Sequence, residues 1–132
     1  MQGREGDCLA EVELDPQWAE ALEGVSPGDY LWIIWWLERT AAVRTRIHPR
    51  GDPSRPLTGL FKTRSPNRPN PLALNLVRVE AVEGSRLRVR WLEAAEGSAV
   101  VDIKPFLPEF DCPTRKGVGS GPARDPSRAR EA

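Results

Sequence analysis

The chain has 132 residues, and its 19 Lys and Arg side chains balance 19 Asp and Glu side chains, so its formal net charge is zero. This length suits one domain with a modest core. The neutral balance excludes a protein whose overall charge attracts nucleic acid or a membrane surface. Any such partner must be bound by a local patch, and residues 39–68 offer one because they hold eight cations and a single acid.

The cysteine, histidine and apolar content narrows the class of protein further. Cys8 and Cys112 are too few and too far apart for a disulfide framework or a zinc site, which favours a reducing compartment. His48 is the only histidine and has no recognisable nucleophile beside it, so neither a catalytic triad nor a metal site is indicated. The longest apolar run, residues 30–37, is far too short to span a bilayer. These features predict a cytoplasmic protein without a metal or membrane partner.

Three elements are expected in the first third of the chain. Residues 8–14 alternate apolar and acidic side chains, which predicts a strand with one solvated face. Asp15 and Pro16 favour the start of a short helix, which Gly24 ends. Residues 30–37 are apolar, aromatic and β-branched, and their number suits a strand. This run predicts the central strand of the sheet, buried on both faces.

A loop, a hairpin and one more strand are expected next. Residues 41–58 contain three prolines and a glycine among arginines, which predicts a long loop. Residues 73–83 and 86–91 predict a hairpin, in which Leu87, Val89 and Trp91 alternate with three arginines. Residues 100–104 predict a further strand.

Several strands, one short helix and no alternation of strands with helices predict an all-β protein, either a sandwich or a small barrel. The domain is expected to cover residues 1–115. Residues 116–132 contain almost no apolar side chains, which predicts a disordered C-terminal tail. The sequence has no glycine-rich turn of the dinucleotide or P-loop kind, so a nucleotide would have to be held in another way.

The stretch TRSPNRPNP, residues 63–71, is both stiff and polar. Its three prolines restrict their own φ angles and the residues before them, so conformational entropy is removed before any ligand binds. Such a loop can present Arg64, Arg68 and Asn70 in fixed directions. The composition leaves two interpretations about equally favoured: a rigid surface connection, or a site for an anionic or nucleotide-like ligand.

Asp102 and Lys104 are two residues apart in an expected strand, so both side chains lie on one face of the sheet. They form either a structural ion pair at a strand end, which is the more common arrangement, or a charged pair that lines a pocket.

Two longer stretches carry a resemblance to a known family. GLFKTRSPNRPNPLALN (residues 59–75) and AEGSAVVDIKPFLPEFD (residues 95–111) are similar to the signature of the TsaA-like (TrmO) family. The resemblance implies a single-sheet small β-barrel that works as a homodimer, with S-adenosyl-L-methionine bound near the subunit interface. It also implies methylation of threonylcarbamoyladenosine at N6, at position 37 of tRNA.

Asp102, Lys104, Arg68 and Asn70 belong to the family's signature. An amide-like nitrogen acceptor must lose a proton, and by position we expect Asp102 to be the base, with Lys104 or Arg68 as its electrostatic partner. The implied cofactor contacts are Gln2, Glu38, Arg39, Arg64, Leu74, Arg90, Trp91, Leu92 and Glu93.

Some positions differ from the family pattern, including Ala73, where glycine is usual, and Glu38, where histidine is frequent. Three functions therefore stay open. The first is an S-adenosylmethionine-dependent N-methyltransferase of tRNA, with the basic stretch contacting phosphates. The second methylates a small molecule. The third is a non-catalytic barrel that binds a nucleotide or RNA.

Overall fold

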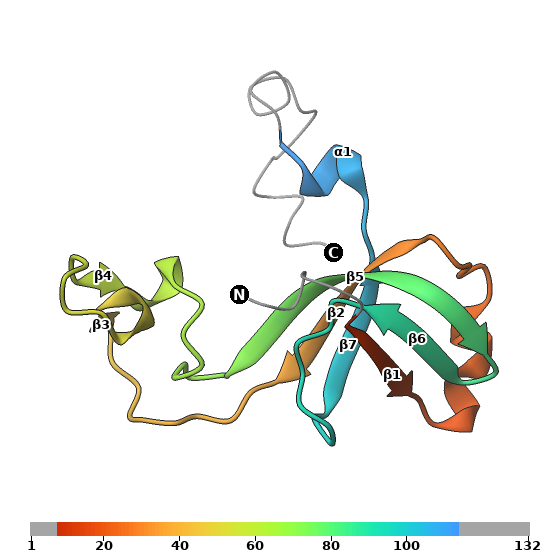
Figure 1. Ribbon diagram of the computed structural model, residues 1–132, viewed down its shortest axis with the longest axis horizontal. Coiled ribbons are helices and arrows are strands. Elements are labelled where there is room, and N and C mark those ends of the chain that lie inside the picture. Colours follow the sequence, from red (N-terminus) through yellow and green to blue (C-terminus); the bar gives the residue numbers. More distant parts are fainter. Residues whose placement is uncertain (1–7, 114–132) are drawn as a thin grey trace, which may run out of the picture.

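The computed structural model describes residues 8–113. The expected tail of residues 116–132 and the expected cofactor contact Gln2 lie outside the described residues. Within them, an antiparallel five-stranded sheet lies at one end of the molecule and a small lobe projects at the other end (Figure 1). The predicted all-β class with one short helix is confirmed.

The middle strand of the sheet is β5 (Leu72–Glu83), and it is shared between two neighbours. Its first half pairs with β2 (Tyr30–Trp36), and its second half pairs with β6 (Arg86–Arg90). The order is completed by β1 (Leu9–Glu13) beside β6 and β7 (Val100–Pro105) beside β2. The predicted hairpin and final strand are therefore confirmed.

The predicted closed barrel is wrong for the residues that the structure describes. β1 and β7 are the two edges of the sheet, and they do not pair with each other. Closure of a barrel requires every strand to have two neighbours at a consistent stagger. A register shift between Val79 and Ala81 bends β5 where it passes from one neighbour to the other, so the sheet is curved but stays open.

The core lies on one face of the sheet. Alternate residues of β2, β5 and β6 are almost fully buried there, including Ile33, Val77 and Leu87 at 0% exposure. Full burial of such a side chain stabilises the fold by roughly 1.5–3 kcal/mol. The prediction that β2 is central and buried on both faces is wrong, because β2 lies beside an edge strand and Tyr30 and Trp36 on its other face are exposed. We call that other face of the sheet the outer face.

Two short helical segments flank the sheet. The expected helix near residue 15 is the 3-10 helix η1 (Pro16–Leu22), which starts at a proline and buries Leu22 in the core. Its Trp18 is exposed and does not pack in the core. At the other end of the described chain, α1 (Pro108–Asp111) forms a single turn after β7.

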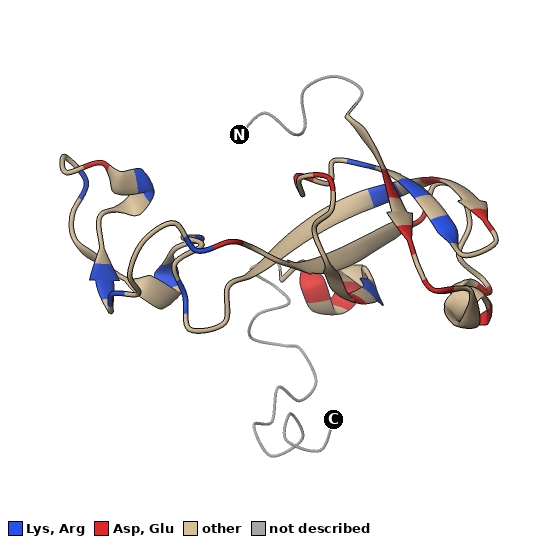
Figure 2. Ribbon diagram, turned by 90° about the horizontal axis from the view of Figure 1, so that it is seen from below, with Lys and Arg blue, Asp and Glu red and all other residues tan. Residues whose placement is uncertain are grey.

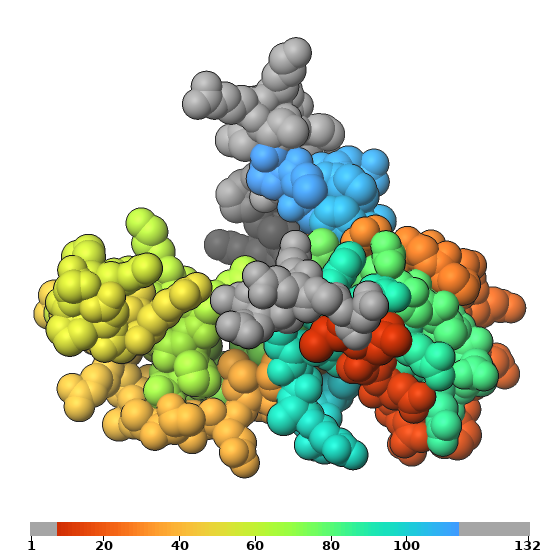
Figure 3. All heavy atoms as spheres, in the orientation of Figure 1, coloured from red at the N-terminus to blue at the C-terminus, as the bar shows by residue number. Residues whose placement is uncertain are grey.

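The expected loop of residues 41–58 contains regular structure that the sequence did not indicate. β3 (Arg46–Ile47) pairs with β4 (Thr58–Gly59), and the 3-10 turns η2 (Pro49–Gly51) and η3 (Leu60–Lys62) lie beside this pair. These residues form the projecting lobe of Figures 1 and 3. Strands of two residues carry too short a pattern to be recognised in a sequence rich in proline.

Acidic and basic side chains are paired across the outer face of β1, β5 and β6. Arg86 lies 2.8 Å from Glu13, a cross-strand pair at the edge of the sheet. In β5, the Glu80 carboxylate lies 2.9 Å from both the Arg78 and the Arg90 side chains. The hydrogen bond from Arg78, and then the one from Arg90, lowers the pKa of Glu80 below its ordinary value of 4.5.

This pKa shift predicts a pH dependence of stability. Because the folded pKa of Glu80 is depressed, its stabilising contribution is present above about pH 4.5 and is lost as the pH falls through the folded pKa. The difference in unfolding free energy between the natural protein and Glu80→Gln should therefore be larger at pH 7 than at pH 3. Urea unfolding at the two pH values measures it, and a difference that does not change with pH would contradict the role given to Glu80.

Candidate functional site

The outer face of the sheet carries a pocket of about 430 Å³. It lies where the middle of β2 and the start of β5 meet the segment that follows β6, beside the proline-rich loop of residues 63–71. Its volume falls in the range of small-molecule sites, and it combines apolar and aromatic walls with charged and polar groups. The lining residues are Trp32, Arg64, Leu74, Asn75, Leu76, Trp91 and Glu93.

Trp91 reaches this pocket because its backbone is left-handed, with φ at 73°. Strand alternation would place Trp91 on the core face with Leu87 and Val89. The positive φ turns it instead to the outer face, where its ring stacks on Tyr30 at 6.4 Å between centroids. The Arg78 guanidinium lies 5.3 Å from the same ring. A positive φ is costly for a bulky residue, and such strain is found most often at functional sites.

Trp32 forms another wall of the pocket and is held from behind by the segment after β7. Its indole N–H donates a 2.9 Å hydrogen bond to the Asp111 carboxylate, which also accepts from the backbone N–H of Leu107. The Phe106 ring packs edge-on against Trp32 at 5.9 Å. These contacts fix the orientation of the indole, so its face toward the pocket is set before a ligand arrives.

Two hydrogen bonds join the core to residues that line the pocket. The buried Trp35 indole donates to Asn75 Oδ1 at 2.8 Å, and Asn75 Nδ2 donates to the Glu93 carboxylate at 3.1 Å. Since Trp35 can only donate, this bond fixes which way the Asn75 amide points. The Glu93 carboxylate is therefore oriented from the core and remains exposed on its other side.

The proline-rich loop is held in place by residues that follow β2. Arg39 Nε donates a 2.8 Å hydrogen bond to the carbonyl oxygen of Arg68, and Arg39 Nη2 donates to that of Pro69. Asn67 Oδ1 accepts from the backbone N–H groups of Thr40 and Ala41, at 2.7 and 2.9 Å. The loop is therefore attached to the sheet by its backbone as well as stiffened by its prolines.

Two of the expected site arginines make structural contacts. The Arg39 guanidinium binds loop carbonyls, and Arg68 Nη1 donates to the carbonyl oxygens of Thr63 and Ser65 in its own loop, at 2.7 and 3.2 Å. Arg64 differs, because its exposed side chain makes no hydrogen bond or ion pair with any residue in the range 8–113. Of these three guanidinium groups, that of Arg64 is the one available to a ligand.

The contacts of Arg39 lead to a prediction about loop order. Arg39→Lys keeps the positive charge but cannot place two donors on two neighbouring carbonyls, because a lysine ammonium lacks the planar fork. Amide hydrogen exchange in residues 63–71 should become at least several-fold faster, while exchange in β5 and β6 stays unchanged. Unchanged exchange in the loop would show that its prolines and the Asn67 contacts hold it without the Arg39 fork.

Asp102 and Lys104 lie on the outer face of β7, 3.3 Å apart, so the predicted shared face is confirmed. Their register partners in β2 are Ile34 and Trp32, and Trp32 lines the pocket. One interstrand spacing, about 4.8 Å, separates them from β2. The pair is exposed and lies beside the pocket, with Trp32 between it and the β5 wall.

The structure brings together some of the expected cofactor contacts and not others. Arg64, Leu74, Trp91 and Glu93 line the pocket. Arg90 lies nearby and is engaged with Glu80, whereas the Leu92 side chain is 8% exposed and belongs to the core. Glu38 and Asn70 are exposed and do not line the pocket.

Sequence reasoning missed three lining residues: Trp32, Asn75 and Leu76. The first was assigned to a strand buried on both faces, and the other two to the first strand of the hairpin. Register with a neighbouring strand, which a single sequence does not display, places Leu76 opposite Trp32 on the outer face. Asn75 lies opposite the buried Ile33 and is joined to Glu93 of the pocket by a hydrogen bond.

A larger hollow, of about 1720 Å³, lies between β1, η1 and β7, and Asp102 and Lys104 are among the residues that line it. Core side chains such as Val12, Leu22 and Leu31 form much of its wall. We assign the cofactor site to the smaller pocket, because four of the expected cofactor contacts line it and only Leu92 among them lines the larger hollow. Among residues 8–113, no group of three or more His, Cys, Asp and Glu side chains is arranged to hold a metal ion. Over the same range, no helix has both the length and the apolar character to cross a bilayer.

Comparison with known families identifies the chain. Residues 1–112 match the tRNA-methyltransferase O N-terminal domain. The chain belongs to the tRNA-methyltransferase O family. The family indicated by the two signature stretches is thereby confirmed.

Relatives with this domain are found in archaea, bacteria and humans. An S-adenosyl-L-methionine-binding protein of Archaeoglobus fulgidus is 38% identical over 111 residues, which cover 84% of this chain and 78% of the relative. A probable S-adenosyl-L-methionine-binding protein of Pyrococcus horikoshii is 41% identical over 106 residues, 77% of this chain and 76% of the relative. The human tRNA (adenine(37)-N6)-methyltransferase is 32% identical over 96 residues, 70% of this chain and 21% of the human protein.

Solved structures of the family have the same fold. A crystal structure of TrmO from Pseudomonas aeruginosa is similar with a TM-score of 0.59 and 29% identity, over 79% of this chain and 44% of that one. A second TrmO crystal structure gives a TM-score of 0.62 and 28% identity, over 89% and 49%. The chain thus spans a little under half the length of these solved TrmO chains.

Proposed function

We propose that this protein binds S-adenosyl-L-methionine in the outer-face pocket and transfers its methyl group to N6 of threonylcarbamoyladenosine at position 37 of tRNA. Family membership, the S-adenosyl-L-methionine-binding relative and the human tRNA (adenine(37)-N6)-methyltransferase support the reaction class. The observation that carries the proposal is the convergence of Trp91, Arg64 and Glu93 on one pocket of suitable volume. They come from two separate segments, the proline-rich loop and the segment after β6, and all three were expected to contact the cofactor.

The pocket residues suit the separate chemical groups of this cofactor. The aromatic rings of Trp32 and Trp91 provide faces on which an adenine ring packs. Arg64 is free to bind a carboxylate with two parallel hydrogen bonds. The Glu93 carboxylate accepts hydrogen bonds from hydroxyl groups and attracts positive charge, which a sulfonium carries.

For the transfer itself, the cofactor supplies an electrophilic methyl group on a positively charged sulfur, so no covalent enzyme intermediate is required. The methyl carbon leaves sulfur and bonds to the acceptor nitrogen, which loses a proton. Asp102 is the proposed acceptor of that proton, and Lys104 Nζ lies 3.3 Å from its carboxylate. The rest of the protein contributes mainly by holding the reacting groups in line.

We also propose that the protein works as a homodimer in the cytoplasm. Trp36, Leu72 and Leu74 are 45%, 40% and 39% exposed on the outer face, beside the pocket. An apolar area of this kind is typical of a surface that a second subunit covers. Light scattering coupled to size-exclusion chromatography tests this, and a strictly monomeric mass at micromolar concentration would contradict it.

The decisive test of the proposed function is a methylation assay on tRNA that bears or lacks threonylcarbamoyladenosine, with labelled S-adenosylmethionine and identification of the product nucleoside by mass. Uptake of label only into tRNA that bears the modified nucleoside is expected. Calorimetry with S-adenosylmethionine accompanies it. Binding without uptake into tRNA would favour a small-molecule acceptor, whereas absence of binding would leave a non-catalytic module.

A further inference from the structure

The projecting lobe at one end of the molecule has a charge unlike that of the rest of the chain. Residues 44–62, which we call the basic lobe, hold five cations and one carboxylate, a net charge of +4. Because the whole chain is neutral, the remaining residues together carry −4. Figure 2 shows mainly Lys and Arg at the lobe, whereas the sheet carries Lys and Arg together with most of the acidic residues. The five cations are Arg44, Arg46, Arg50, Arg55 and Lys62.

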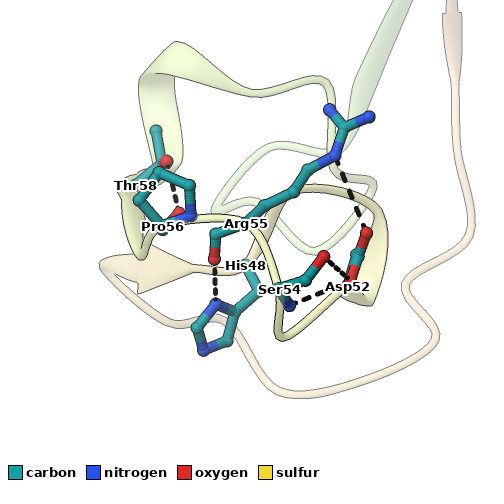
Figure 4. A network of polar contacts seen from close by, with 6 residues as sticks. All are labelled: His48, Asp52, Ser54, Arg55, Pro56 and Thr58. Atoms are coloured by element: carbon teal, nitrogen blue, oxygen red, sulfur yellow. Dashed lines mark hydrogen bonds and ion pairs between the residues drawn. The ribbon is translucent and has the colours of Figure 1, made fainter.

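The basic lobe is a folded unit, although it contributes only Leu60 to the buried side chains. Its β3–β4 pair is supported by a network of polar contacts at the tip (Figure 4). Asp52 accepts from the Ser54 hydroxyl at 2.6 Å and from its backbone N–H at 2.9 Å. His48 Nδ1 lies 2.8 Å from the carbonyl oxygen of Arg55. Because a carbonyl oxygen can only accept a hydrogen bond, Nδ1 is the donor in this contact.

This internal network leaves most of the positive charge of the lobe available. Arg55 is 3.8 Å from Asp52, an exposed and weak pair. The hydrogen bonds from Ser54 lower the pKa of Asp52, so its single negative charge persists at neutral pH. The other four cations make no ion pair with any residue that the structure describes. Most arginines of the sheet, by contrast, are paired with carboxylates across strands.

An aromatic ring stands among these charges. Phe61 in η3 is 83% exposed, more than any other large hydrophobic side chain in residues 8–113. The Arg68 guanidinium lies 5.8 Å from the ring centroid and leaves most of the ring accessible. Exposing this ring to solvent does not stabilise the fold. An exposed aromatic ring beside cations such as Lys62 and Arg68 is, however, a common arrangement for stacking an unpaired base.

We propose that the basic lobe is a docking surface for single-stranded RNA, in which Phe61 stacks on one base and the free cations contact neighbouring phosphates. The surface is separate from the pocket on the sheet, and the loop of residues 63–71 connects the two. The inference rests on the proposed function in taking RNA, and not an acidic protein, as the partner. In this proposal Arg39 and Arg68 hold the loop through its carbonyl oxygens, and the cations of the basic lobe bind the RNA.

The test measures RNA affinity separately from methyl transfer. A fluorescent single-stranded 12-nucleotide RNA and a tRNA transcript serve as probes in anisotropy titrations between about 50 and 200 mM salt. Three variants are compared with the natural protein: Phe61→Ala, the double change Arg44→Gln with Arg46→Gln, and the matched double change Arg86→Gln with Arg88→Gln on the sheet. The two double variants alter the net charge equally, so only the place of the lost charge differs.

Four free cations predict a slope of log affinity against log salt of about −3, and loss of two should make it shallower by about 1.4 to 1.8. Affinity of the lobe double variant at 100 mM salt should fall roughly tenfold or more. Phe61→Ala should weaken binding by about fivefold to 100-fold with little change of slope. The sheet double variant should retain at least half of the natural affinity.

Equal losses in the two double variants would overturn the inference, since charge alone would then suffice. So would natural affinity in the lobe double variant, or competition by poly-glutamate as effective as competition by RNA. Calorimetry with S-adenosylmethionine on the same variants distinguishes this failure from failure of the proposed function. Normal cofactor binding with unaltered RNA binding contradicts the lobe assignment alone, whereas absence of methyl transfer by the natural protein contradicts the proposed reaction.

Discussion

Asp102→Asn is expected to lower the rate of methyl transfer by about 100-fold to 10,000-fold while the affinity for S-adenosylmethionine stays within about twofold of the natural value. The amide keeps the shape of the side chain but cannot accept the proton that the acceptor nitrogen must lose. Asp102 is exposed and its pair with Lys104 is solvated, so the fold does not depend on this charge. Single-turnover rates and calorimetry measure the two quantities.

The control for this experiment is Glu83→Gln, which removes an exposed carboxylate from the far end of β5 and should leave the rate unchanged. Full turnover by Asp102→Asn with normal cofactor affinity would remove Asp102 from the mechanism.

Trp91→Asn is expected to weaken S-adenosylmethionine binding by roughly 10-fold to 100-fold, because the pocket loses an aromatic wall. Asparagine is chosen over alanine since it tolerates the left-handed φ of 73°, so the backbone of residues 92 and 93 keeps its course. Loss of the stacking on Tyr30 and of the contact with Arg78 should cost about 1–3 kcal/mol of stability. Calorimetry and urea unfolding measure the two effects.

Trp18→Ala is the matched control, since it removes an equally large ring that is 56% exposed on η1 and does not line the pocket. It should leave cofactor binding unchanged. Trp91→Phe should keep most of the affinity, because it restores an aromatic face. If Trp91→Asn bound the cofactor as well as the natural protein does, the outer-face pocket would not be the cofactor site.

The hairpin and the last strand could be predicted from the sequence because their information is local. In residues 86–90, arginines alternate with Leu87 and Val89, and this period of two gives both the strand and its buried face. The turn at Gly84, with φ at 61°, likewise needs a residue that adopts a left-handed backbone at little cost. The family signature in residues 59–75 and 95–111 carried the functional class, and the match over residues 1–112 confirmed the family.

Other features depend on contacts between distant segments. Periodicity placed Trp91 on the core face, and only its left-handed backbone moved it into the pocket. The position of β2 in the strand order depends on which strands pair, and so do the two open edges of the sheet. A single sequence does not show the strand pairing. The roles of Arg39 and Arg68 could not be predicted either, because both bind backbone carbonyls, which every residue has.

The sequence by itself determined the β-rich class, the stiff polar loop and, through its signature, the family. These follow from proline geometry, strand periodicity and a long motif, all of which are properties of neighbouring residues. Only the tertiary structure decided which arginines are free. Arg64 and four of the five cations of residues 44–62, all but Arg55, stay unpaired among the described residues, while Arg39 and Arg68 are engaged with the loop. A guanidinium is available to a ligand only when no nearby carbonyl or carboxylate already accepts its hydrogen bonds, and that depends on where the chain folds back.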